Sequence, residues 1–394
     1  MDQTSEGIEA PLVVDATAPS SASMAHQPPQ TDNIQHFQPQ LPPQLSSSPH
    51  LQPPITTPSK SKSSSSKSGK KKANPKLNAI NLLNLLGYLT SLITSYLGGV
   101  AGWFGGMSNA ELSLKYQTLI TPSATYFGYI WGIIFLFEGF FAVSQLLPQF
   151  RNHILVTEGI GYVFFLACVA QTTWTVTFGY ELMMAAFLAM MALFLFLLTL
   201  LRRQWTIVAD EMEKIQTLIA TGEIDTEEDV TEDFTARPPR LSYWLLRFGF
   251  GVHAGWIAPA TPLMLCVLFV QLGMEPNYEL WVGVISLPLL FGCCMGLLLR
   301  EEPGAPSYVF PGVVAYACAG ISWELYAPSN AILTRHDEAS ISLMKNLTGF
   351  CAACLMVVIV SRCIALFLRD QCMKRKNKGE TVEIDGVEYP YLKV

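Results

Sequence analysis

Two ionisable side chains, Glu138 and His253, stand within long apolar stretches of the sequence. A carboxylate inside a membrane costs at least a few kcal/mol on insertion scales, so such groups usually face a protein interior or a watery cavity. By helical rise, Glu138 lies about 4 Å and His253 about 6 Å from the bilayer midplane, on the same side. We therefore expect the two to be partners, as a packing pair or as a proton carrier. The alternative is a protonated Glu138 that is bonded to a backbone carbonyl.

Two tryptophans, Trp131 and Trp256, also lie deep in these stretches, at most about 7 Å from the same midplane. A buried indole N–H needs a hydrogen-bond partner, so both are candidates for the wall of a pocket. Phe127, Trp131 and Glu138 follow i, i+4, i+11 spacing, which lays them along one helix face.

Gln171 is a third polar residue within the apolar stretches, one turn before Trp174. It fits an interhelical hydrogen bond more readily than a ligand contact, although both remain open. The remaining tryptophans fall near expected helix ends, where this residue commonly forms an interfacial belt. They are Trp103, Trp174, Trp205, Trp244, Trp281 and Trp323.

The elements that must position these residues are membrane helices. Half of the residues are hydrophobic and 14% are charged, whereas a soluble domain carries about a quarter charged residues. The apolar runs after Leu77 are long enough to cross a hydrocarbon core of roughly 30 Å. We predict an all-α fold, a polytopic transmembrane helical bundle. Its helices, about eight in number, are expected near 79–103, 124–147, 155–178, 180–201, 242–270, 279–299, 306–326 and 341–368.

Composition also divides the chain. Residues 1–75 are rich in Ser, Pro and Gln and end in a lysine cluster, which predicts a disordered tail. The cluster is expected either to contact anionic lipid or to act as a topology signal in a phosphorylatable linker. Residues 76–370 form the bundle, with an acidic cytoplasmic loop at 202–240, and 371–394 form a short cytoplasmic tail.

The basic residues predict the orientation. With the N-terminus in the cytoplasm, nearly all lysines and arginines outside the helices fall on the cytoplasmic side, and Lys115 and Arg335 fall on the other. Both termini are therefore expected in the cytoplasm. The first residues match neither a signal peptide nor a transit peptide, which favours the endomembrane or plasma membrane.

The sequence lacks the motifs of several common catalytic and phosphate-binding sites. The membrane stretches contain no aspartate, no Gly-x-Ser-x-Gly, no His-Glu-x-x-His and no phosphate-binding glycine loop. Cys351 and Cys354 have metal-like spacing without a second pair, so we expect inert thiols and no metal site. The charge pattern gives no nucleic-acid footprint, and the sequence predicts a protein that is not an enzyme.

Segment 121–132 reads Thr-Pro-Ser, then Phe127, then Ile-Trp-Gly. It resembles the translocator protein/tryptophan-rich sensory protein (TspO/MBR) family, most closely the longer TspO/MBR-related members. Three further stretches match that family in order, at 168–174, 247–261 and 308–321. The resemblance implies a helical membrane protein that binds tetrapyrroles or sterols in an aromatic pocket, often as a homodimer.

On this resemblance, the pocket is lined by Phe127, Trp131, Trp174 and Trp256. The sequence departs from the family in its expected helix number, which is about eight rather than five. His253 stands where an aliphatic or aromatic residue is usual, and Glu138 is not part of the likeness.

Three functions follow as hypotheses, all for a protein within the lipid bilayer. The first is a receptor or transporter for a small apolar ligand, such as a porphyrin or sterol, and no other cofactor is expected. The second is a proton-coupled secondary transporter that uses Glu138 and His253. The third is a structural membrane subunit. The candidate ligand-binding residues are Phe127, Trp131, Glu138, Gln171, Trp174, His253 and Trp256.

Overall fold

The long apolar stretches become helices, because a chain in hydrocarbon must satisfy its backbone hydrogen bonds internally. The computed structural model describes residues 76–103, 105–222, 241–300, 308–377, 383–384 and 387–388. The tail expected at 1–75 and the acidic run from Glu223 to Asp233 lie outside these residues.

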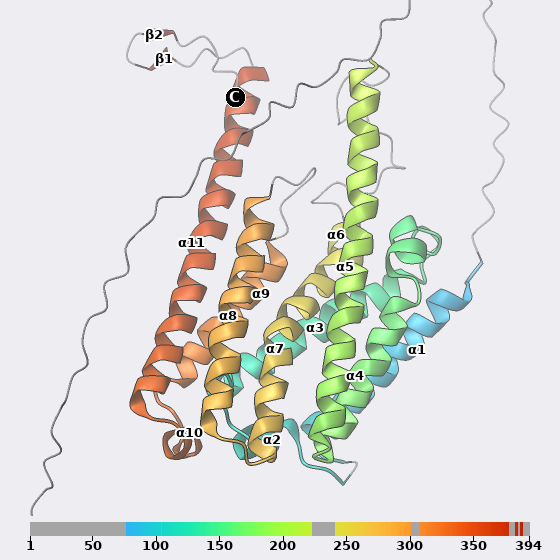
Figure 1. Cartoon of the computed structure of the whole chain (residues 1–394). Helices are drawn as coiled ribbons and strands as arrows, with labels where there is room; N and C mark the ends of the chain where they lie inside the picture. The colour runs from blue at the N-terminus through green and yellow to red at the C-terminus, as the bar shows by residue number, and fades with distance from the viewer. Residues whose placement is uncertain are drawn as a thin grey trace, which may run out of the picture. The chain divides into compact units, whose positions relative to one another are not determined.

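The described chain is built almost wholly of helices (Figure 1). In chain order they are α1 (Ala79–Thr94), the π-helical η1 (Ser95–Val100), α2 (Asn109–Lys115), α3 (Ala124–Ser144), the π-helical η2 (Leu155–Ile160), α4 (Val163–Gly179), α5 (Met183–Ala220), α6 (Leu241–Tyr243), the π-helical η4 (Trp244–Phe248), α7 (Gly249–Gln271), α8 (Pro276–Leu299), α9 (Val309–Glu324), α10 (Asn330–Arg335) and α11 (Glu338–Asn377). Two antiparallel strands, β1 (Glu383–Ile384) and β2 (Val387–Glu388), follow α11.

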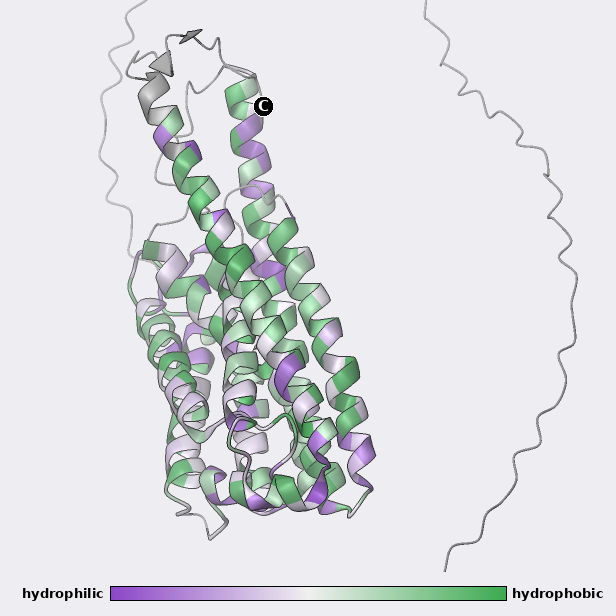
Figure 2. Ribbon diagram, turned by 90° about the vertical axis from the view of Figure 1, so that its left-hand side faces the viewer, coloured by the Kyte–Doolittle hydropathy of each residue, from purple (hydrophilic) through white to green (hydrophobic). Residues whose placement is uncertain are grey.

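Each of the eight expected ranges contains a helix, so the all-α polytopic bundle is confirmed. Among the described residues, six helices are long and apolar enough to cross a membrane. The helix α4 is apolar but shorter, with 17 residues, and α9 has 16. Figure 2 shows hydrophobic residues along most of the bundle, with hydrophilic residues gathered mainly toward its two ends.

The break expected at 178–180 is also confirmed. The helix α4 ends at Gly179, and Glu181 adopts a φ of 59°, a left-handed conformation that L-residues other than glycine rarely take. The Glu181 carboxylate accepts hydrogen bonds from Tyr116 and from Lys115, whose Nζ lies 2.5 Å away. Gln271 Nε2 donates to the Glu181 carbonyl at 2.6 Å. Three separate contacts therefore hold this turn.

Two helices are longer than the sequence boundaries indicate. The helix α5 continues past 201 to Ala220, so the loop expected at 202–240 begins as helix. The reason is an apolar stripe that continues through Val208, Met212 and Ile215, which are buried against η2 and the segment before it. The helix α11 likewise extends past 370, into the region expected as the C-terminal tail.

The helix α7 lies at the centre of the bundle. Within its most apolar window 72% of the residues are buried, against 17% to 33% for the other five long helices. It contacts α3, α5, α8 and α9. At Gly255 an added Cβ would lie 2.9 Å from the Phe310 carbonyl oxygen, so only glycine lets α7 approach α9 this closely.

The two ends of the bundle differ. The helices α5 and α11 extend beyond the others at one end, and the short helices α2 and α10 lie at the opposite end (Figure 1). At the α10 end, Glu279 of α8 is fully buried and pairs with Arg335 and His336. These contacts fix the segment between α9 and α11 to the first turn of α8. They were not expected from the sequence.

Candidate ligand-binding cavity

A column of stacked rings joins α3 to α4. Trp131 stacks on Phe135, one turn further along α3, and on Trp174 of α4, with ring centroids 5.8 Å apart in both pairs. Trp174 in turn stacks on Phe178 at 5.4 Å. The i, i+4 spacing on each helix places two rings above one another, and the stacking of Trp131 on Trp174 joins the two pairs into one column.

Phe127 extends this aromatic wall at its α2 end. Its ring lies 6.3 Å from Trp131 and 5.9 Å from Trp256 of α7. Phe127, Trp131, Phe135 and Trp174 together form a surface that we call the aromatic wall. Aromatic pairs in such offset and edge-on arrangements contribute about 0.5–1.5 kcal/mol each beyond their area burial.

A cavity of about 490 Å³ lies against the aromatic wall. All four wall residues line it, together with parts of α1, η1, α2 and the end of α9. Of the candidate residues named from the sequence, it brings together Phe127, Trp131, Gln171 and Trp174. The family-like aromatic positions and Gln171 therefore share one cavity.

For Trp174 the sequence offered a place in the interfacial belt or in the pocket wall, and its burial supports the second. Its side chain is 3% exposed and is stacked inside the bundle, because α3 supplies Trp131 as a partner. The belt expectation fits Trp103, Trp281 and Trp323 better, since they are 73%, 61% and 66% exposed. Depth along one helix does not reveal which neighbouring ring will cover a tryptophan.

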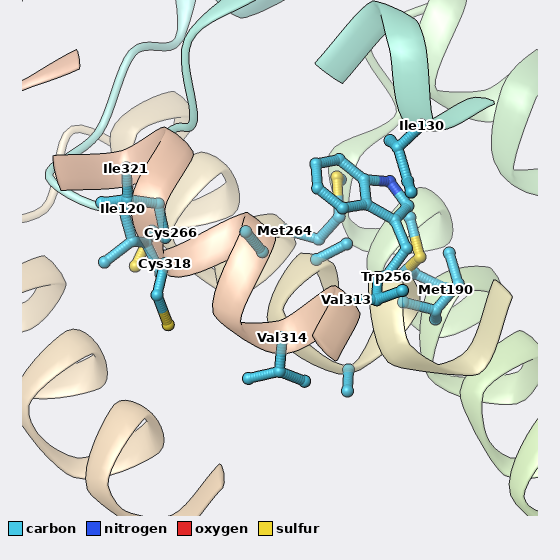
Figure 3. Packing of buried hydrophobic residues seen from close by; sticks show 14 of the residues in the cluster. Ile120, Ile130, Met190, Trp256, Met264, Cys266, Val313, Val314, Cys318 and Ile321 are labelled. Atoms are coloured by element: carbon cyan, nitrogen blue, oxygen red, sulfur yellow. The ribbon is translucent and has the colours of Figure 1, made fainter. Parts of the chain in front are cut away.

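Trp256 lies on the other side of the aromatic wall. It is 2% exposed and lines a much smaller void of about 30 Å³, which Phe127, Trp131 and Trp174 also line. Figure 3 shows its indole among buried apolar side chains from neighbouring helices, with Ile130 and Met190 among the labelled residues. The three shared aromatic residues thus separate the larger cavity from the core around Trp256.

The predicted pairing of Glu138 with His253 is confirmed as a contact. His253 Nδ1 lies 2.7 Å from Glu138 Oε1, and each side chain is 4% exposed. Gly249, one turn before His253, allows the close approach of α7 to α3, because an added Cβ would lie 3.1 Å from the backbone of Phe137. A backbone carbonyl is thus not needed as the partner of Glu138.

This pair stands behind the cavity rather than on its surface. Neither Glu138 nor His253 is among the lining residues of the cavity or of the smaller void. The His253 ring meets Trp131 edge-on, with centroids 5.8 Å apart and an interplanar angle of 72°. Trp131 therefore contacts both the cavity and the buried pair.

Several buried polar atoms around Trp131 have no hydrogen-bond partner among the described residues. They include both amide atoms of Gln171, His253 Nε2 and the indole nitrogens of Trp131, Trp174 and Trp256. A buried polar group without a partner costs about 1–3 kcal/mol. Unpartnered groups of this kind need an explanation, and a bound water or ion is one.

The end of the cavity beside α2 is polar. Asn109, Ser113, Gln117 and Glu324 line it, and Gln117 Nε2 donates to Glu324 Oε1 at 3.0 Å. The hydroxyl of Ser329 donates to the amide oxygen of Gln117. Sequence reasoning missed Glu324, because a charged residue at the end of an apolar helix resembles an ordinary solvated boundary.

The part of the chain that the structure describes contains no candidate metal site. No group of three or more His, Cys, Asp or Glu side chains there is arranged to hold a metal ion. Cys351 is buried and Cys354 half-buried, and both are free thiols.

Comparison with known proteins agrees with this geometry. A family model described as TSPO-like protein matches residues 81–361, which include every residue that lines the cavity. No curated protein and no solved structure matches the chain. The match covers well over half of the sequence and the whole candidate site. This chain therefore belongs to the family of TSPO-like proteins.

Proposed function

We propose that this multi-pass membrane protein binds a small, largely apolar ligand in the cavity beside the aromatic wall. TSPO-like proteins are generally non-enzymatic, so the expected role is that of a receptor, sensor or transporter. The cavity volume of about 490 Å³ falls within the ~300–1,000 Å³ that is usual for small-molecule sites.

The observation that carries the proposal is the combination of stacked rings and unpartnered polar groups at one cavity. Trp131 and Trp174 offer a broad apolar surface, and Gln171 has an amide without a protein partner. A ring-shaped ligand of the tetrapyrrole or sterol kind would bury its flat body against such a wall. The resemblance to the TspO/MBR family points to the same ligand classes.

Binding is tested with protoporphyrin and a fluorescent sterol, titrated into the purified protein in nonionic detergent. Trp131→Ala removes the central ring of the wall, and we expect it to weaken binding at least about tenfold, which is about 1.4 kcal/mol. Trp281→Ala is the matched control, because Trp281 is 61% exposed and does not line the cavity. Equal binding by both variants would refute this site.

A second candidate function is proton-coupled transport, favoured by the buried contact between Glu138 and His253 at 2.7 Å. A pair that can exchange a proton is a common device in membrane transporters. Uptake driven by a pH gradient in proteoliposomes, lost in Glu138→Gln, would support it. If neither ligand binding nor uptake is found, the third hypothesis applies, in which the pair only fixes helix packing in a structural subunit.

The orientation and assembly remain part of the proposal. The distribution of basic residues supports cytoplasmic termini, which would place the polar end of the cavity, beside α2, on the opposite side of the membrane. The family resemblance supports a homodimer.

A further inference from the structure

The charge of the cavity wall restricts what the cavity can hold. Among the described residues that line it, Glu324 is the only aspartate, glutamate, lysine, arginine or histidine. An anion in this cavity would meet one carboxylate and no cation. Burial of a charge without a partner of opposite sign is costly, so the wall disfavours ligands with carboxylate groups.

Glu324 itself has no counter-charge. Its hydrogen bond comes from the neutral amide of Gln117, and no ion pair connects it to a lysine, arginine or histidine within the described residues. The lysine of α2, Lys115, pairs with Glu181. Glu324 is the last residue of α9, and the C-terminal end of a helix carries partial negative charge, so the helix gives this carboxylate no stabilisation.

The rest of the wall suits an apolar body with a cationic head. Trp131, Trp174 and Phe127 give the cavity an apolar surface against which a ring-shaped body can pack. An amine that reached Glu324 would form a charge-assisted hydrogen bond, which is about twice as strong as a neutral one.

We propose that the ligand of this cavity is a cationic amphiphile, with a ring-shaped apolar body against the aromatic wall and an amine head that donates to Glu324. This inference rests on the proposed function and narrows it, because it favours a ring-bearing amine over an anionic tetrapyrrole. It also gives Glu324 and Gln117 distinct roles. Glu324 binds the head group, and Gln117 holds the carboxylate in position.

The test uses three probes that share one ring body and differ only in head group: pyrenemethylamine, pyrenemethanol and pyrenecarboxylate. Each is titrated with the full-length protein in nonionic detergent, and binding is followed by the fluorescence anisotropy of the probe. We expect the amine to bind at least about tenfold more tightly than the carboxylate, with the alcohol between them.

Glu324→Gln removes the charge and keeps the size of the side chain. We expect it to lower the affinity for the amine to that for the alcohol, and to leave the alcohol unchanged within about twofold. Glu275→Gln is the matched control, since it removes the same charge from an exposed residue at the start of α8, outside the cavity.

The outcomes separate this inference from the proposed function. If the carboxylate binds the unmodified protein as tightly as the amine, or if Glu324→Gln keeps the preference, the inference is wrong while ligand binding stands. If every probe binds the unmodified protein no more tightly than it binds Trp131→Ala, both the inference and the proposed function are wrong. If Glu324→Gln does not fold, the order of the three probe affinities for the unmodified protein is sufficient to test the inference.

Discussion

Two buried glutamates in this protein are neutralised in different ways. Glu138 lies in the middle of α3, and its contact is with a single histidine, His253 of α7. Glu279 lies in the first turn of α8, and it meets both the guanidinium of Arg335 and, at 3.3 Å, Nε2 of His336. Both residues are almost fully buried, at 3% and 0% exposure.

The difference lies in whether the partner can lose its charge. The guanidinium of Arg335 keeps its positive charge, so Glu279 always faces a cation. A histidine ring can be neutral or positively charged, so the contact between Glu138 and His253 is either a neutral hydrogen bond or an ion pair. The first arrangement suits a structural tie at the end of the bundle. The second leaves a group available for chemistry beside Trp131, at the wall of the cavity.

The sharpest test of this contrast is Glu279→Gln. It leaves the Arg335 guanidinium, whose side chain is 27% exposed, without a carboxylate. Breaking a buried ion pair on one side typically costs about 3–5 kcal/mol of stability. We expect a loss of that size in chemical unfolding of the detergent-solubilised protein, against less than about 0.5 kcal/mol for Glu275→Gln at the exposed surface. A loss below about 1 kcal/mol would show that Glu279 is not a structural tie.

The inner pair is tested by a double-mutant cycle of Glu138→Gln and His253→Ala. Each single change leaves the other side chain buried without its partner, and we expect a cost of about 1–3 kcal/mol. The double variant should lose less than the sum of the single losses by about 1 kcal/mol, because the second change removes a group that is already unsatisfied. Additive losses, within about 0.5 kcal/mol, would contradict the coupling.

The smallest effect is expected at a third glutamate, Glu181, which is partly exposed. Hydrogen bonds from Lys115 and then from Tyr116 lower the pKa of Glu181 below its ordinary value of 4.5. Because the pKa is lower in the folded state, this contribution is present above pH 4.5 and is lost as the pH falls through the folded-state pKa. The melting temperature of the unmodified protein should therefore converge on that of Glu181→Gln below pH 4.5. A gap that persists at low pH would be inconsistent with this origin.

The sequence predicted much of this architecture. The apolar runs gave the eight helical ranges and the break near Gly179, because length and hydropathy are properties of each segment alone. The pairing of Glu138 with His253 followed from depth, since an isolated charge at that position would be too costly. Phe127, Trp131, Gln171 and Trp174 were all named as candidates, and they share one cavity.

Other features could not be predicted from local patterns. Glu279 and Glu324 stand near helix ends, where charged residues are common and usually solvated, so nothing local indicated that one is buried and the other lines a cavity. The extension of α5 to Ala220 was missed because its stripe is amphipathic rather than uniformly apolar, and its covering surface comes from the chain around η2.

The sequence by itself determined that this is a helical membrane protein and that Glu138 needs a partner inside it. Those conclusions depend on the cost of placing one segment or one charge in hydrocarbon, which each residue carries wherever it packs. Only the tertiary structure decided that Trp174 joins the aromatic wall, that Trp256 and the pair of Glu138 and His253 stand behind it, and that Glu324 faces the cavity. A cavity is the space left between several packed helices, so its position depends on all of them together.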